Sequence, residues 1–320
     1  LLISLANEVY YTATEAECQL LVAEGLEMAR RLGDDALLME MCSSAFLAVW
    51  HPWTAVQRLS LADEAVELAQ RLGDARGEAM ALAQRAAVHG ELGHVEDLER
   101  DLGEAHGLAV ALQLTYARWF LDCMRLPWLA MRGELEEARS TLDGLLTLVD
   151  TIAVPHKHDA VGGLMLVLAI WGGLDDREDG VLDELVAAAR VPIHMAATGF
   201  LVRLGRTDAA RELFETSRPT LDDESWIAPL IWGFGAEVGL ALGERGLAAA
   251  AYERLAPLRG GVLSAGSTIA MGPVDAFLAA GDGDATLAAR HADDAVRLMQ
   301  TWQIPLAEQW FLRQRDLHGF

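Results

Sequence analysis

The sequence predicts an all-α fold, a right-handed superhelical solenoid of about eight helical hairpins that forms a single domain over residues 1–320. Three observations predict it, and the first two are glycines that recur at a fixed interval and helical periodicity in the segments between them. The third is that no alternating polar and apolar run reaches the length of a strand. Gly261–Ile269 comes nearest, and we interpret it as a loop that enters a helix.

Two series of helix ends alternate along the first half of the chain. At intervals of 40 residues, the first series contains Leu32-Gly33-Asp34, Leu72-Gly73-Asp74 and Leu112-Gln113-Leu114. The second series has the same interval and contains Gly93, Gly133 and Gly173, with later helix ends at Gly205, Gly243 and Gly281. A helix commonly ends on a residue with positive φ, which glycine adopts without steric penalty, and an aspartate after it can cap the next helix. The two series therefore mark the turns within and between hairpins.

The segments between these ends carry apolar residues at helical spacing. Leu61, Ala65 and Leu68, for example, recur three and four positions apart. Pro127 lies inside a predicted helix and predicts a kink at Trp128 or a broken first turn. The predicted helices span residues 2–9, 15–32, 35–49, 56–72, 75–92, 96–112, 115–132, 135–150, 157–171, 176–189, 193–204, 207–217, 225–242, 246–257, 267–280, 284–301 and 305–317.

Composition limits the classes of partner. The net charge of −23 repels the phosphates of nucleic acids and anionic lipids, so we expect neither nucleic acid nor membrane as a partner of this segment. The longest apolar run, residues 160–174, is shorter than the ~20 residues that cross a bilayer. Cys18, Cys42 and Cys123 lack metal-binding spacing, and we expect buried, reduced thiols in a cytoplasmic protein.

Several units share a pattern in which a glycine turn precedes a large apolar residue and then an alanine. Gly133, Leu135 and Ala138 form one copy, and the segment 204–214 contains another. The small alanine allows the two helices of a hairpin to approach closely. This pattern is similar to that of tetratricopeptide repeats, so we expect a tetratricopeptide-like solenoid.

The C-terminal third carries a narrower resemblance. Its residues are Ser225-Trp226-Ile227, Leu242-Gly243, Tyr252 with Leu255 and Pro257, and Gly272-Pro273-Val274. This set is similar to the C-terminal tetratricopeptide region of large bacterial signal-transduction ATPases, which include ATP-dependent LuxR-type transcriptional regulators and ATPases fused to nucleotide cyclase domains. The helix end at residues 30–34 also resembles this region.

The resemblance implies a regulatory role. In that family an upstream NTPase module switches state, and the tetratricopeptide region is thought to sense an inducer or partner and to restrain the ATPase. This chain contains no GxxxxGK[ST] phosphate loop and no basic helix-turn-helix, so the resemblance implies the sensing or docking segment alone. Because the chain begins at Leu1 inside a predicted helix, we expect it to be part of a larger protein with an NTPase module upstream.

A search for catalytic and metal-binding motifs predicts no enzyme, no cofactor and no metal site. GxSxG, HExxH and GxGxxG do not occur. His156 and His158 fall on different sides of a helix and suit only a loop site for a metal, whereas an exposed helix start is the alternative interpretation. We interpret the carboxylates of residues 175–179 as a solvated helix start, and residues 282–284 lack the other ligands of a calcium loop.

Registering the first helices of the hairpins against the glycine turns predicts the lining of a concave groove. A groove with apolar walls and a few polar groups is typical of a small-molecule site. The alternative is that these side chains pack inside a twisted superhelix without an open groove. The predicted groove residues are Met80, Gln84, Trp119, Phe120, Met124, Leu230, Phe234, Glu237, Met271 and Asp275.

The leading functional hypothesis is a sensing or docking domain that binds a small-molecule inducer or a protein partner in this groove. The acidic balance favours a cationic ligand or a basic peptide. The alternative is a protein–protein interaction scaffold without a small-molecule ligand. An enzyme would need a close pair of titratable groups, which residue spacing does not reveal.

Overall fold

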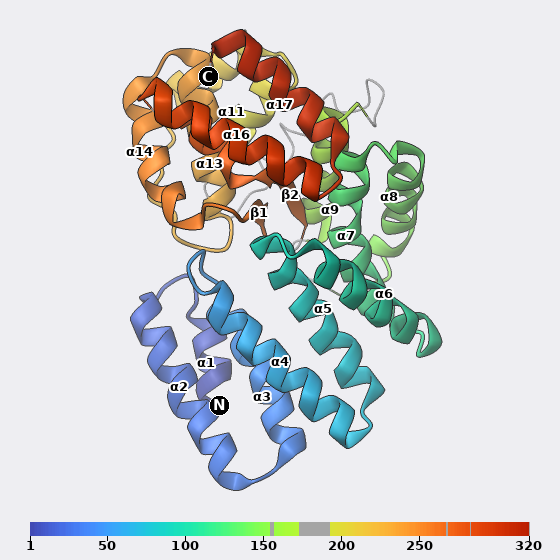
Figure 1. Cartoon of the computed structure of the whole chain (residues 1–320). Helices are drawn as coiled ribbons and strands as arrows, with labels where there is room; N and C mark the ends of the chain where they lie inside the picture. Colours follow the sequence, from blue (N-terminus) through green and yellow to red (C-terminus); the bar gives the residue numbers. More distant parts are fainter. Residues whose placement is uncertain (154–156, 173–192, 267, 282, 320) are drawn as a thin grey trace. The chain divides into compact units, whose positions relative to one another are not determined.

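The computed structural model describes residues 1–153, 157–172, 193–266, 268–281 and 283–319 (Figure 1). These residues form sixteen α-helices, one 3-10 helix and one β-hairpin, so the predicted helical class is confirmed with one exception. The chain divides into an N-terminal unit, Leu1–Leu121, and a C-terminal unit, Asp122–Phe320, which are described in turn. Within the described part, no helix combines the length and apolar character that a membrane crossing needs.

The N-terminal unit is a series of antiparallel helices stacked in chain order. From α1 to α6 each helix packs on the next, and α1 also packs on α3, and α3 on α5, as expected for stacked hairpins. The boundaries agree with the sequence prediction to within one residue. The helices are α1 (Leu2–Glu8), α2 (Glu15–Leu32), α3 (Asp35–Ala48), α4 (Ala55–Leu72), α5 (Ala75–Leu92) and α6 (Val95–Ala111), followed by the start of α7 (Thr115–Arg132).

The predicted glycine turns are present as left-handed residues. Gly33, Gly73 and Gly93 have φ of 68°, 69° and 74°, and Gln113 takes the same conformation at 53°. Asp34 and Asp74 then cap the next helix by accepting two backbone N–H groups each. The sequence series therefore marks the helix ends correctly, including the one at which glutamine replaces glycine.

Small residues allow the helices of the N-terminal unit to approach closely. Ala62, Ala65 and Ala69 on α4 are fully buried, as are Ala79 and Ala83 on α5. Alanine contributes little side-chain volume and loses no side-chain entropy on burial. The predicted role of alanine in the hairpins is consistent with this packing.

The C-terminal unit continues the helical pattern and includes most of α7. Here α11 packs on α12 and α13, α13 packs on α14 and α15, and α15 packs on α16, which packs on α17. α7 runs through Pro127 as one helix. The remaining elements are α8 (Leu135–Val149), α9 (Lys157–Ile170), α11 (His194–Arg203), α12 (Thr207–Ser217), α13 (Ala228–Leu242), α14 (Arg245–Leu255), the 3-10 helix η2 (Ala256–Leu258), β1 (Val262–Ala265), β2 (Ile269–Pro273), α15 (Val274–Gly281), α16 (Ala285–Thr301) and α17 (Pro305–His318).

The β-hairpin corrects two predictions. The segment interpreted as a loop, 261–269, contains β1 and the first residue of β2, and the helix predicted over 267–280 begins only at Val274. The strands pair antiparallel, with Ser264 opposite Ala270. All four residues of β1 are buried, and Gly233 on α13 leaves room for the side chain of Leu263. A strand buried on both faces has no polar and apolar alternation, so periodicity cannot reveal it.

The three cysteines are buried free thiols, as predicted. Burial raises the pKa of Cys42 to about 12 and also raises the pKa of the Cys123 thiol. A thiol with so high a pKa is a poor nucleophile at neutral pH. Two other predictions, the helix over 176–189 and the turn at Gly173, fall outside the described residues.

A substitution at Gly239 on α13 tests the close packing of α13 on α14. A Cβ atom at Gly239 would lie 2.7 Å from the backbone nitrogen of Ala248. We expect Gly239→Ala to lower the free energy of unfolding by about 1–3 kcal/mol, because the backbone of α14 has to move away. Nothing lies within 4 Å of a Cβ at Gly246 on α14, so Gly246→Ala should be neutral or stabilising by up to ~1 kcal/mol. Chemical denaturation measures both, and equal effects would contradict the packing.

Candidate functional site

Two of the four predicted groove residues of the N-terminal unit lie inside the helix packing. Gln84 and Trp119 are 6% and 4% exposed, whereas Met80 and Phe120 are half-buried. The Gln84 Nε2 group donates to the backbone oxygen of Ser43 at 3.0 Å. Among the described residues, the Gln84 Oε1 and Trp119 Nε1 atoms are buried without a hydrogen-bond partner. These two residues therefore retain one unused polar atom each.

In the C-terminal unit the predicted groove residues are all buried, and the two acidic ones have polar partners inside the unit. Glu237 accepts two hydrogen bonds from Arg203, at 2.9 and 2.5 Å. Asp275 accepts from the backbone N–H of Gly260 at 2.7 Å and lies 3.5 Å from the Nδ1 atom of His291. The two carboxylates thus serve contacts inside the unit.

The four apolar groove residues of this unit, Met124, Leu230, Phe234 and Met271, are at most 4% exposed. The ring of Phe234 packs against Phe200, with ring centroids 5.0 Å apart. Met271 was predicted to lie on a helix and lies on strand β2 instead. Their burial agrees with the alternative that side chains at these positions fill the helix packing.

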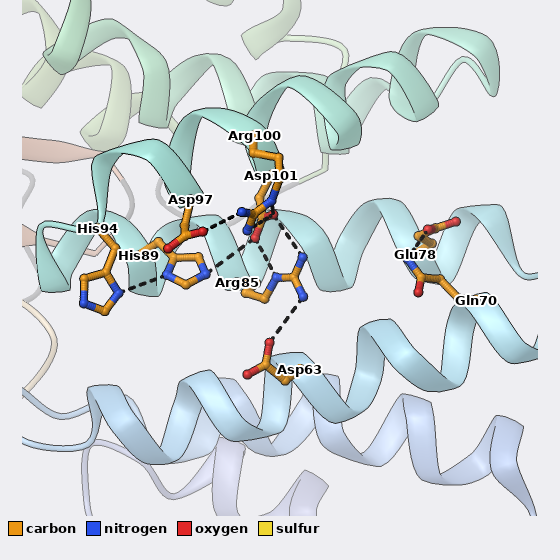
Figure 2. Close-up of polar contacts among 9 residues, drawn as sticks. All are labelled: Asp63, Gln70, Glu78, Arg85, His89, His94, Asp97, Arg100 and Asp101. Carbon is orange, nitrogen blue, oxygen red and sulfur yellow. Dashed lines mark hydrogen bonds and ion pairs between the residues drawn. The ribbon is translucent and has the colours of Figure 1, made fainter.

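A cluster of charged side chains joins α5 and α6 in the N-terminal unit (Figure 2). Its centre is Asp101, which is fully buried. The Arg85 guanidinium donates two hydrogen bonds to Asp101, at 2.6 and 3.0 Å, and Arg100 donates two more, at 3.2 and 3.1 Å. Arg85 also reaches Asp63 on α4 at 3.2 Å. The buried carboxylate is therefore compensated by two guanidinium groups, as a buried charge requires.

Three side chains capable of binding a metal lie beside Asp101. One ligand atom each from His89, His94 and Asp97 falls within 4.8 Å of the others. The two Nδ1 atoms of the histidines are 3.3 Å apart, and the rings point toward each other (Figure 2). His89 is buried, Asp97 is half-buried and His94 is exposed, so the group opens toward solvent.

The electrostatics of this group favour a neutral imidazole beside a charged carboxylate. Burial lowers the pKa of His89, so its ring is neutral at neutral pH. The Arg100 guanidinium donates to Asp97 at 2.5 Å and holds the pKa of that carboxyl below its usual range. A neutral imidazole and an ionised carboxylate are the forms that bind metal ions.

The motif search missed this group because its members do not lie on one helix face. His89 lies in the last turn of α5, His94 precedes α6 and Asp97 lies in the first turn of α6. The sequence did contain one indication of this group, because Gly93 between the two histidines is a predicted helix end. Residues on either side of such a turn are brought together by its backbone hydrogen bonds.

A second buried cation lies in the C-terminal unit, where aromatic rings surround Arg203. Its guanidinium carbon lies 3.6 Å from the ring centroid of Trp310, 5.6 Å from that of Trp171 and 5.4 Å from that of Phe277. With Glu237 as counter-ion, these rings stabilise a charge that is 2% exposed. The arrangement joins α11, α13, α15 and α17 and serves the packing of the unit.

No protein-family model matches the chain, and comparison with curated proteins finds no significant match. The resemblance to the tetratricopeptide region of signal-transduction ATPases therefore remains a prediction from the sequence.

Replacing Asp101 tests the centre of the charged cluster. Asp101→Asn leaves the partly buried Arg85 without its main counter-charge, and we expect the free energy of unfolding to fall by about 3–5 kcal/mol. Asp63→Asn is the control, because Asp63 contacts the same arginine with a side chain that is 49% exposed. Its loss should stay below about 1 kcal/mol. Urea denaturation compares the variants, and a similar small loss at both positions would contradict the assignment of Asp101 as the centre.

Proposed function

We propose that this chain is the sensing or docking domain of a bacterial ATPase-type transcriptional regulator, which binds a small-molecule inducer or a protein partner. The helices of the N-terminal unit stack in chain order with left-handed turns at the predicted positions, and this supports a repeat domain of the tetratricopeptide type. Repeat domains of this kind bind other molecules through the surfaces that their stacked helices present.

The unused polar atoms of Gln84 and Trp119 carry the proposal. A buried polar atom without a hydrogen-bond partner lowers the free energy of unfolding by about 1–3 kcal/mol. Among the described residues, Gln84 Oε1 offers an acceptor and Trp119 Nε1 offers a donor, both at positions predicted to line the groove. A bound molecule that supplies a donor to the first or an acceptor to the second would recover that free energy.

The charge of the chain narrows the class of ligand. With a net charge of −23, association is favoured for cationic small molecules and basic peptides and disfavoured for nucleic acids and anionic membranes. The proposed role of this chain is binding rather than catalysis. An NTPase module in the same protein would respond to the bound ligand or partner.

A thermal-shift screen of cationic and apolar metabolites and basic peptides tests the proposal. For a stabilising ligand, we expect Gln84→Met or Trp119→Phe to weaken binding by about tenfold, because each removes the group that would hydrogen-bond the ligand. Each variant should also lower the stability of the free protein by about 1–2 kcal/mol, because Gln84→Met removes the bond from Gln84 Nε2 to the backbone oxygen of Ser43 and Trp119→Phe leaves a small void at a buried ring.

Trp232→Phe is the matched control. Trp232 Nε1 donates to the backbone oxygen of Leu221 at 3.0 Å, so this variant should lose about 1–2 kcal/mol of stability and keep its affinity. The proposal would be contradicted if no compound stabilises the protein, or if the two groove variants bind the hits as tightly as the native chain.

An exposed apolar patch favours the second candidate function, a protein–protein interaction scaffold. Leu20 on α2 is 71% exposed and Val56 on α4 is 74% exposed. The two helices are joined here by reciprocal hydrogen bonds between Gln19 and Gln57, at 3.0 and 2.8 Å. Trp53, which is 48% exposed, donates to Glu15 at the start of α2. Large apolar side chains that are exposed on neighbouring helices are typical of an interface.

A charged residue introduced into this patch distinguishes the protein-interaction function from the ligand-sensing function. Val56→Asp adds a carboxylate in the first turn of α4, where the helix dipole favours it, so the fold should keep its stability within about 0.5 kcal/mol. If the patch docks a protein or a second copy, association measured by light scattering or pull-down should be lost. Val110→Asp, at a residue 49% exposed on α6, is the control. Unchanged association in Val56→Asp would exclude the patch as an interface.

A further inference from the structure

The turn between α5 and α6 places His89 and His94 side by side. The backbone N–H of His94 donates to the carbonyl oxygen of His89 at 2.9 Å, and Gly93 donates to Gly90 at 3.4 Å. This pair of bonds around a left-handed glycine is a Schellman motif. In this motif the residue after the glycine lies next to the residue five positions earlier. The contact between the two rings is therefore a consequence of the turn.

The same turn elsewhere in the chain carries different side chains. The bond between a residue and the carbonyl five positions earlier also occurs at five other helix ends. In each of those pairs at least one side chain is apolar, as is usual for this motif. Only the pair in the α5–α6 turn supplies two imidazoles among these six. The other pairs are Ala69 with Asp74, Ala109 with Leu114, Leu129 with Glu134, Leu201 with Arg206, and Met299 with Ile304.

The third donor follows from the start of α6. His94 is the N-cap residue of α6, and Asp97 is the third residue of the helix proper. A side chain at that position reaches back toward the N-cap residue, as in a capping box. One carboxylate oxygen of Asp97 therefore lies within 4.8 Å of a ring nitrogen of each histidine. Arg100 donates to the Oδ1 atom of Asp97.

We propose that His89, His94 and Asp97 form a binding site for a divalent transition-metal ion, with Zn²⁺ as the ion they suit. Bonds of about 2.0–2.1 Å from zinc to two nitrogens of a tetrahedron place those nitrogens about 3.3–3.4 Å apart. The two Nδ1 atoms are 3.3 Å apart. Two imidazoles and one carboxylate are a donor set for zinc rather than for Mg²⁺ or Ca²⁺, which prefer oxygen ligands alone. The fourth position faces solvent.

The surroundings of His89 match those of a metal ligand. Histidine ligands typically donate their other ring N–H to a carboxylate, which orients the ring and fixes the tautomer. The Nε2 atom of His89 lies 3.8 Å from Asp101, which faces its opposite ring edge. Asp101 is itself held by Arg85 and Arg100, so the buried histidine has a rigid support (Figure 2). The charged cluster around Asp101 would then position His89, the metal ligand that α5 supplies.

A metal ion at this turn would join the end of α5 to the start of α6. It would link the two helices of one hairpin through side chains, in addition to the backbone bonds of the turn. Binding free energy that is available only to the folded hairpin adds to its stability. The site does not depend on the docking role proposed above.

Zinc titration of the untagged, chelator-treated chain in competition with a chromophoric chelator tests the site. We expect one equivalent of Zn²⁺ to bind and to raise the melting temperature, and Mg²⁺ to do neither. His94→Ser removes one ligand and should weaken zinc binding by at least about tenfold. Serine is a favoured N-cap residue, so this variant should melt no lower than the native chain without metal.

Asp97→Asn should weaken zinc binding by a similar factor, whereas His106→Ser, the control on α6, should leave it unchanged. Co²⁺ should give the intense visible absorption of a tetrahedral site in the native chain and lose it in His94→Ser. A native chain that binds no Zn²⁺, or zinc binding that survives both His94→Ser and Asp97→Asn, would overturn the proposal. In that case the two rings share only a hydrogen bond.

Discussion

The left-handed residue at the end of many of the described helices is the constraint on which the rest of the structure depends. It reverses the chain within a few residues, so that the next helix runs back along the previous one. Gly33, Gly73 and Gly93 take this conformation in the N-terminal unit, and Gly133, Gly205 and Gly243 take it later. Two bonds around the turn also determine which side chains meet, as His89 and His94 do. A local backbone requirement thereby decides both the packing of the helices and the composition of the candidate metal site.

Buried ion pairs are the second recurring feature. Arg58 donates to Glu91 with its guanidinium fully buried, Arg85 donates to Asp101, and Arg203 donates to Glu237. Each pair joins two helices, and each arginine donates at least two hydrogen bonds to its partner. Such pairs add little net stability over an apolar contact, but a misaligned helix would leave a charge uncompensated. In a chain whose repeats share alanine and leucine at most buried positions, we infer that such pairs disfavour an incorrect helix register.

The candidate site shows which features residue spacing can predict and which it cannot. The helix ends and the aspartate caps could be predicted because each depends on a few consecutive residues. The cluster around Asp101 could not, because its members become neighbours only when α5 packs on α6. Burial also reassigned predicted groove residues such as Phe234 and Asp275 to the interior of the C-terminal unit. Periodicity identifies the apolar face of a helix, but it does not say whether that face meets another helix or an open surface.

The sequence alone determined where the helices of the N-terminal unit begin and end to within one residue, because glycine, aspartate and apolar spacing act within one or two turns of the chain. It also determined the acidity that limits the class of partner. The tertiary structure decided the rest: that strands β1 and β2 pair, that Glu237 binds Arg203, and that His89, His94 and Asp97 lie close together beside Asp101. The physical reason is that burial and pairing depend on neighbours distant in the chain or across a turn, whose positions no short stretch of residues specifies.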